Sequence, residues 1–207
     1  MSMPASGLAF PALASGTLPG MEPLILPEPS IDPSAFVATT ARVYGSVEIL
    51  ARAVVMFGVV LRAELDRILI GEETNVQDNV VVHADLGIPA TIGRRVTIGH
   101  AAVVHGASID DHCLVGIGAL ALNGSVLGEG AWLAAGSVLP EGRSIPPWTL
   151  AVGTPAKPLR DLRPEEIRRQ DEGVETYLRF AETYRRIVSP TRTSSSPPPA
   201  VGETRPS

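Results

Sequence analysis

Three of the four histidines lie between positions 83 and 105, where each is flanked by small or β-branched residues. These three are His83, His100 and His105, and neutral imidazole is a common metal ligand. Three histidine ligands that leave a fourth position open are typical of catalytic rather than structural zinc. The remaining histidine, His112, follows two aspartates and is expected to be an ordinary corner residue. Whether the other three imidazoles converge depends on how the chain between them winds.

Further polar residues around these histidines are candidates for the same site. An ion pair of Arg62 with Asp78 has two interpretations: a surface pair worth ~0–1 kcal/mol, or a pair between chains near the site. Asn75 and Gln77 are likewise either corner residues or members of the site.

The elements that position these residues are indicated by a repeat. Large aliphatic residues, or alanine in their place, recur every six residues, with slips after Leu61, Val82 and Val104, where we expect loops at corners. A smaller or β-branched residue follows four positions later, and the second position is often glycine. The aliphatic series comprises Ile31, Val37, Val43, Ile49, Val55, Leu61, Ile70, Val76, Val82, Ile92, Ile98, Val104, Ile109, Val115, Ala121, Leu127, Leu133, Leu139, Ile145 and Ala151.

No α-helix has a period of six, and a fixed short period is typical of a parallel β-helix. Each hexad supplies a short strand and a corner, and three hexads close one triangular coil. The inward aliphatic side chain then stacks on its counterpart in the next coil, about 4.8 Å away. A narrow prism has little room for aromatic residues, which make up only 4% of this chain. The sequence therefore predicts a mainly β fold built as a parallel β-helix.

The domain organisation follows from where the repeat begins and ends. We expect a flexible Pro/Gly-rich leader at 1–30, with at most an edge strand around Leu24-Ile25-Leu26, and a β-helix domain at 31–160. Pro164 and two glutamates open a predicted helix at 161–188, with the apolar stripe Ile167, Val174, Leu178, Ala181 and Tyr184. Residues 189–207 are predicted to be a disordered tail. One hypothesis is that Met21 is the true start.

Composition excludes several classes of function. The net charge is −5 and basic residues do not cluster, which argues against a nucleic-acid partner. No apolar run approaches the ~20 residues that span a bilayer, so we expect no membrane partner. The single cysteine, Cys113, rules out an internal disulfide framework, and no basic stretch suits a signal peptide. These features predict a cytoplasmic protein.

The repeat also predicts which polar residues share a face. His83 and His105 occupy the same hexad position one coil apart, about one strand spacing from each other, with Arg62 one coil below. His100 lies on the neighbouring face, with Asp78 one coil below it. Two histidines at this spacing can share a metal, but His100 points around a corner. A second chain related by a threefold axis can supply it, which predicts a homotrimer with sites at its interfaces.

These residues are similar to those of a known family. The chain resembles the gamma-class carbonic anhydrases of the hexapeptide-repeat, left-handed β-helix superfamily over Ile31 to about Arg160 and the C-terminal helix. The hexapeptide pattern alone is weak, since acyltransferases share it, whereas three histidines with Arg and Gln-Asp are far more specific. The matching segments are Leu61-Arg62-Ala63-Glu64, Asn75-Val76-Gln77-Asp78, Val82-His83, Ile98-Gly99-His100, His105-Gly106 and Val152-Gly153-Thr154-Pro155-Ala156-Lys157.

The resemblance implies reversible hydration of carbon dioxide to bicarbonate by a homotrimer with zinc, or iron or cobalt, at each interface. His83 and His105 would bind the metal from one subunit and His100 from its neighbour. It further implies that Gln77, oriented by Asn75, hydrogen-bonds the activated water. The resemblance also implies that Arg62 pairs with acidic groups across the interface, here Asp78 and Glu64.

Two features depart from the family pattern. Glu64 stands where the family usually has Asp, and the short segment 84–89 lacks the glutamate-bearing loop that carries protons in the prototype. Asp85 is a candidate substitute. Two alternatives to a carbonic anhydrase remain at this stage: an acyl-CoA thioesterase or acyltransferase on the same scaffold, and a non-catalytic component of a trimeric assembly.

Overall fold

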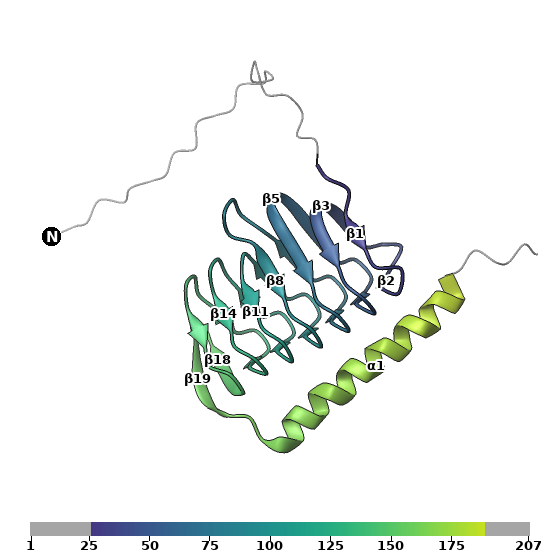
Figure 1. The fold of residues 1–207 in the computed structure, drawn as a ribbon. Coiled ribbons are helices and arrows are strands. Elements are labelled where there is room, and N and C mark those ends of the chain that lie inside the picture. The colour runs from purple at the N-terminus through teal and green to yellow at the C-terminus, as the bar shows by residue number, and fades with distance from the viewer. Residues whose placement is uncertain (1–25, 189–207) are drawn as a thin grey trace, which may run out of the picture.

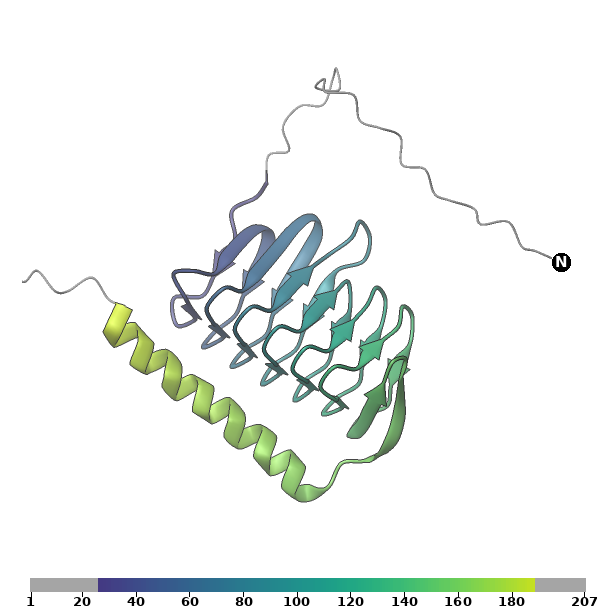
Figure 2. The same cartoon turned by 180° about the vertical axis from the view of Figure 1, so that it is seen from behind.

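The computed structural model describes residues 26–188. These residues form a parallel β-solenoid of about seven coils with one long helix alongside, as Figures 1 and 2 show from opposite sides. The predicted fold class is confirmed. The proposed start at Met21 and the predicted tail at 189–207 lie outside the described residues, as do Leu24 and Ile25 of the proposed edge strand; Leu26 is not in a strand.

The solenoid has three faces, named here for what they carry. The helix face consists of β2 (Phe36–Val37), β4 (Val54–Val55), β6 (Asn75–Val76), β9 (Thr97–Ile98), β12 (Leu114–Val115), β15 (Trp132–Leu133) and β18 (Thr149–Gly153). It ends in β19 (Ala156–Asp161), which pairs antiparallel with β18, an ending that the hexad pattern did not predict.

The histidine face consists of the first halves of β3 (Arg42–Ile49) and β5 (Val60–Ile70), with β7 (Val81–His83), β10 (Val103–His105), β13 (Leu120–Ala121) and β16 (Val138–Leu139). The third face consists of β1 (Ser30–Ile31), the second halves of β3 and β5, β8 (Ala90–Ile92), β11 (Ser108–Ile109), β14 (Val126–Leu127) and β17 (Ser144–Ile145).

The six-residue series forms the core. From Ile49 onward every member of the series is buried. The first three are not: Ile31 is 44% exposed, and Val37 and Val43 are only partly buried. They belong to the terminal coil, where no described coil stacks on the outer side, so part of their apolar surface stays open.

Glycine at the second hexad position has a steric cause. A Cβ on Gly71 would lie 2.2 Å from the carbonyl oxygen of Gly93 in the next coil, closer than any real contact. Adjacent coils therefore approach backbone to backbone at this corner, which only glycine permits.

The predicted loop after Leu61 is wrong. Residues 60–70 form the continuous strand β5, which pairs with β3 on one side and with β7 and β8 on the other. Pairing along both edges satisfies the backbone groups as a strand, so the chain turns the corner without leaving the sheet. Arg62 and Glu64, which lie in this segment, are therefore held by a rigid strand.

The C-terminal helix α1 (Pro164–Val188) lies along the helix face and contacts β4, β6 and β9. Val174, Leu178 and Ala181 of the predicted stripe are buried against it. The helix runs through Gly173 without a break. At its start, the Glu166 carboxylate accepts a hydrogen bond from the backbone N–H of Arg163, as in half of a capping box.

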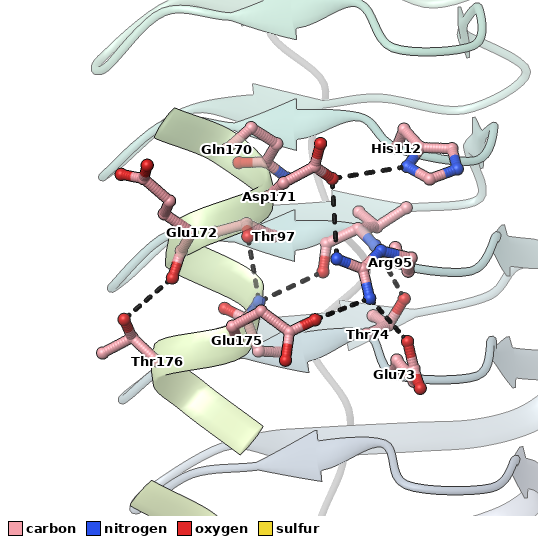
Figure 3. Close-up of polar contacts among 12 residues, drawn as sticks. Glu73, Thr74, Arg95, Thr97, His112, Gln170, Asp171, Glu172, Glu175 and Thr176 are labelled. Atoms are coloured by element: carbon pink, nitrogen blue, oxygen red, sulfur yellow. Dashed lines mark hydrogen bonds and ion pairs between the residues drawn. The ribbon is translucent and has the colours of Figure 1, made fainter. Parts of the chain in front are cut away.

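A polar network attaches the middle of α1 to the solenoid (Figure 3). Arg95, at a corner of the solenoid, donates hydrogen bonds to Glu73 at 2.7 Å and to Glu175 of the helix at 3.0 Å, and lies 3.5 Å from Asp171. Burial lowers the pKa of Arg95, but the hydrogen bonds to the two glutamates raise it by more. The guanidinium therefore stays charged and joins two segments far apart in sequence. Within residues 26–188 no helix is both long and apolar enough to cross a membrane.

Candidate metal centre

His83 and His105 lie side by side at the end of the histidine face. They are register partners on β7 and β10, so the parallel ladder places one directly above the other. Nδ1 of His83 is 2.9 Å from Nε2 of His105, and the rings stack with centroids 4.9 Å apart. The one-coil spacing predicted from the hexads is confirmed. Two imidazole nitrogens thus face the same point in space.

Glu64 and Arg62 belong to β5, the strand that pairs with β7 one coil below the histidines. Arg62 pairs with His83 in the strand register, as predicted, and its guanidinium donates to Oε1 of Glu64. Burial raises the pKa of Glu64, but the hydrogen bond and charge of Arg62 lower it by more, so the carboxylate is ionised. Its other oxygen, Oε2, is buried 3.3 Å from Nε2 of His83 and accepts no hydrogen bond within the described residues.

Asp85 and Asn123, at the next corner of the solenoid, complete the group. Oδ1 of Asp85 lies 3.7 Å from His83 and 3.7 Å from His105, and Nδ2 of Asn123 donates to Oδ2 at 2.7 Å. We call these six residues the first half-site: Arg62, Glu64, His83, Asp85, His105 and Asn123. It carries five charged or titratable side chains around one opening.

His100 lies at the opposite edge of the histidine face. Its Nδ1 is 3.0 Å from Oδ2 of Asp78, one coil below as predicted, and its Nε2 is 3.3 Å from the hydroxyl of Tyr177 on α1. A carboxylate on one ring nitrogen is the usual support of a metal-binding histidine, since it sets the tautomer and aims the other nitrogen outward. Here that other nitrogen is Nε2, which within one chain contacts the Tyr177 hydroxyl.

Asn75 and Gln77 join His100. The Asn75 amide donates to the hydroxyl of Thr97 at 2.9 Å, and its oxygen accepts from Nε2 of Gln77 at 3.2 Å. Oε1 of Gln77 accepts from the backbone N–H of His100 at 3.2 Å. The amide of Gln77 is therefore held in one orientation. We call the second half-site the group Asn75, Gln77, Asp78, His100 and Tyr177.

Within one chain, the predicted site residues therefore form two separate groups rather than one. Strand β10 begins just after His100 and ends at His105, so the two half-sites stand on the order of 10 Å apart across the histidine face. Arg62 and Asp78 do not meet within the chain, and the partner of Arg62 is Glu64. His112 lies in neither group: it stacks on Trp148 and approaches Asp171 at 3.9 Å, as expected of a corner residue.

A cavity of about 500 Å³ lies between the helix face and α1. Its wall is mostly apolar, and one end is formed by Gln77 and Tyr177 of the second half-site. The other lining residues include Leu114, Ile117, Trp132, Leu150 and Gly173.

The donor set fits a divalent metal ion. Two converging imidazoles with a carboxylate beside them are ligands that zinc, iron and cobalt all accept. The unpartnered Oε2 of Glu64 leaves an acceptor next to the same point, and it can receive a hydrogen bond from a bound water. A third imidazole, His100, is supported by Asp78 in the way that metal ligands are.

Two residues of the half-sites were missed from the sequence alone. Asn123 occupies the coil above the His105 corner, and Tyr177 lies on α1 between two buried stripe residues, Val174 and Leu178. The hexad count could have placed Asn123 near His105. Nothing in the sequence relates Tyr177 to His100, because that contact depends on where the helix docks.

A parallel β-solenoid built from six-residue repeats is the architecture of the hexapeptide-repeat proteins, and solved structures agree. A putative acetyltransferase from Bacillus cereus superposes with a TM-score of 0.76 at 33% identity, covering 77% of this chain and 93% of that one. A hexapeptide transferase family protein from Anaplasma phagocytophilum gives 0.73 at 40% identity, covering 75% and 92%. No protein-family model matches the chain.

Curated relatives identify the family within this class. The chain is 46% identical over 147 residues to a probable carbonic anhydrase of Methanocaldococcus jannaschii, covering 71% of this chain and 92% of the relative. It is 36% identical over 159 residues to a carbonic anhydrase of Geobacillus kaustophilus, covering 77% and 87%. A mitochondrial gamma carbonic anhydrase 2 of Arabidopsis thaliana is 37% identical over 162 residues, 75% of this chain; the match spans 58% of that relative. The chain belongs to the gamma carbonic anhydrase family.

Proposed function

We propose that this protein catalyses the reversible hydration of carbon dioxide to bicarbonate at metal sites between the subunits of a homotrimer. Zinc, iron or cobalt would be held by His83 and His105 of one subunit and His100 of its neighbour. The observation that carries the proposal is the division of the chain into two half-sites on opposite edges of one face. Each half-site lacks part of the three-histidine set, and together the two contain all three histidines.

The histidine face itself supports association. One ladder of outward residues in strand register begins at Arg42 and continues with five apolar residues, called here the apolar ladder: Val60, Val81, Val103, Leu120 and Val138. The equivalent ladder on the third face carries Thr91, Ser108 and Ser144 among its members. The helix covers neither face, since it lies along the helix face. A second copy seated on the apolar ladder would bury it and bring its His100 toward His83 and His105.

Different residues of the chain would have different roles in the reaction. A bound divalent ion lowers the pKa of water toward ~7, which supplies a nucleophile for carbon dioxide at neutral pH. The free Oε2 of Glu64 would accept a hydrogen bond from that water, and Arg62 holds the carboxylate in place and ionised. Gln77, fixed by Asn75, would orient the reacting oxygens from the second half-site. Each turnover also releases one proton, which must leave for solvent.

The test measures metal content and carbon dioxide hydration in protein purified anaerobically, for the native chain, His100→Ala and His112→Asn. We expect about one metal ion per native chain. His100→Ala should lower metal affinity at least about tenfold and abolish most hydration, because one imidazole ligand is lost. His112→Asn is the control, since it changes the corner histidine and asparagine tolerates its positive φ of 61°. Native protein without metal or hydration would overturn the proposal, as would full metal affinity in His100→Ala.

The cavity beside Gln77 and Tyr177 favours a second candidate. An apolar chamber of about 500 Å³ can accept an acyl group, as a thioesterase using the same metal centre would need. Acyl-CoA hydrolysis is therefore assayed beside hydration. Metal with thioester cleavage alone would move the assignment to a thioesterase, and metal with neither activity to a non-catalytic component of an assembly.

A further inference from the structure

Three potential ligand atoms of one chain already surround a single point. Nδ1 of His83 and Nε2 of His105 are 2.9 Å apart, and Oδ1 of Asp85 lies 3.7 Å from each nitrogen. Within the described residues, this is the one group of three or more such side chains whose ligand atoms all lie within 4.8 Å of one another. His100 is not part of it.

The triangle has the dimensions of a metal site. The point equidistant from its three corners lies about 2 Å from each, and zinc binds histidine nitrogen and carboxylate oxygen at about 2.0–2.2 Å. The corners of a tetrahedral zinc site are separated by roughly 3.3 Å, which lies between the observed 2.9 and 3.7 Å. An ion can therefore be accommodated with little movement of any of the three side chains.

Asp85 is held in this position by the next coil. The amide of Asn123 donates to Oδ2 at 2.7 Å, which leaves Oδ1 directed at the histidines. Gly106 makes room for that amide: a Cβ at Gly106 would lie 2.2 Å from Oδ1 of Asn123. A carboxylate oriented through its second oxygen is a common feature of metal ligands.

We propose that a single chain binds a divalent metal ion through His83, Asp85 and His105, and that His100 of a second copy replaces the carboxylate on assembly. The inference rests on the proposed function, whose finished site has three histidines. Two histidines with one carboxylate are a complete set of protein ligands for zinc and for non-haem iron. The metal would then enter one half-site before the trimer closes over it, and Asp85 would be freed beside the ion.

The test removes the incoming ligand and asks whether Asp85 carries the remaining affinity. Full-length metal-free His100→Ala and His100→Ala/Asp85→Asn are titrated with Co²⁺, followed by its visible absorption, and with Zn²⁺ against a chelator. We expect His100→Ala to bind one ion per chain and the added Asp85→Asn to weaken binding at least about tenfold. Adding Asp161→Asn instead, at an exposed carboxylate of β19, should leave the affinity unchanged.

The outcomes separate this inference from the proposed function. Equal affinity with and without Asp85 would overturn the inference, while metal binding and hydration by the native chain would leave the function standing. Native chains that bind no metal would overturn both. Circular dichroism checks that the solenoid is intact. If Asp85→Asn does not fold, Asn123→Ala in the same background decides: the inference requires a measurable loss of affinity and is overturned by none.

Discussion

Glu64 stands where the resemblance led us to expect aspartate, and its side chain, one methylene longer, contacts two partners. The side chain reaches from Arg62 to His83, with one oxygen paired to the guanidinium and the other beside Nε2. The substitution therefore preserves a carboxylate at the first half-site.

Cys113 gives a prediction at the scale of one residue. Its side chain is fully buried, and burial raises the pKa of the thiol to about 12 from an ordinary value of 9.0. Only the thiolate is nucleophilic, so the folded protein should react with iodoacetamide at pH 8 far more slowly than the chain in guanidinium. Comparable rates in both states would contradict the prediction.

The same shift predicts an alkaline loss of stability. Well below pH 9 the thiol is protonated in both states and contributes no pH dependence. Between pH 9 and 12 only the unfolded chain releases the proton, so the free energy of unfolding should fall as the pH rises. Chemical unfolding of Cys113→Ala measured over this range should show a shallower fall than the native chain.

At the scale of elements, the position of α1 decides whether Tyr177 reaches His100. Apolar contacts of Val174 and Leu178 and the Arg95 network hold the helix on its face. Gln170, almost fully buried, adds a hydrogen bond of 3.0 Å to the carbonyl of Cys113. These contacts specify both the rotation and the height of the helix along the solenoid.

Replacement of Arg95 tests this docking. Arg95→Met keeps the aliphatic stem but removes the hydrogen bonds to Glu73 and Glu175, so we expect a loss of about 1–2 kcal/mol of unfolding free energy and faster hydrogen exchange in α1. Arg94→Met is the matched control, because Arg94 is an exposed neighbour; its effect should stay within about 0.5 kcal/mol. Equal effects of the two variants would show that the network does not hold the helix.

At the scale of the whole molecule, the three faces of the solenoid differ in what covers them and in their polarity. The helix covers one, the third carries polar residues, and the histidine face presents an apolar ladder. Val81 at its centre keeps 38% of its surface exposed. Because the two half-sites flank this ladder, association through it would also complete the proposed three-histidine centre.

The apolar ladder predicts that a charged side chain placed on it prevents assembly. Val81→Asp places a carboxylate in the centre of the proposed interface. Because this side chain points away from the core, the chain should still fold, but it should run as a monomer in sedimentation analysis. Thr91→Asp is its counterpart on the third face and should leave the trimer intact. A trimeric Val81→Asp protein would exclude this face as the interface.

The sequence alone was enough to predict the solenoid, the register of His83 over His105, and the position of His100 above Asp78. These follow from a six-residue period, because every coil has the same geometry and stacking converts sequence spacing into position. It also predicted the helix, whose apolar stripe is a local pattern.

How the side chains divide between the two half-sites depends on the folded chain. The continuous β5, the Arg62–Glu64 pair, the turn that brings Asp85 to the histidines and the contact of Tyr177 with His100 all depend on corners and docking. A repeat specifies which face a residue occupies, but not the rotamer it adopts or the element packed against it. Those are chosen by contacts between segments far apart in sequence, where burial and hydrogen bonding act together.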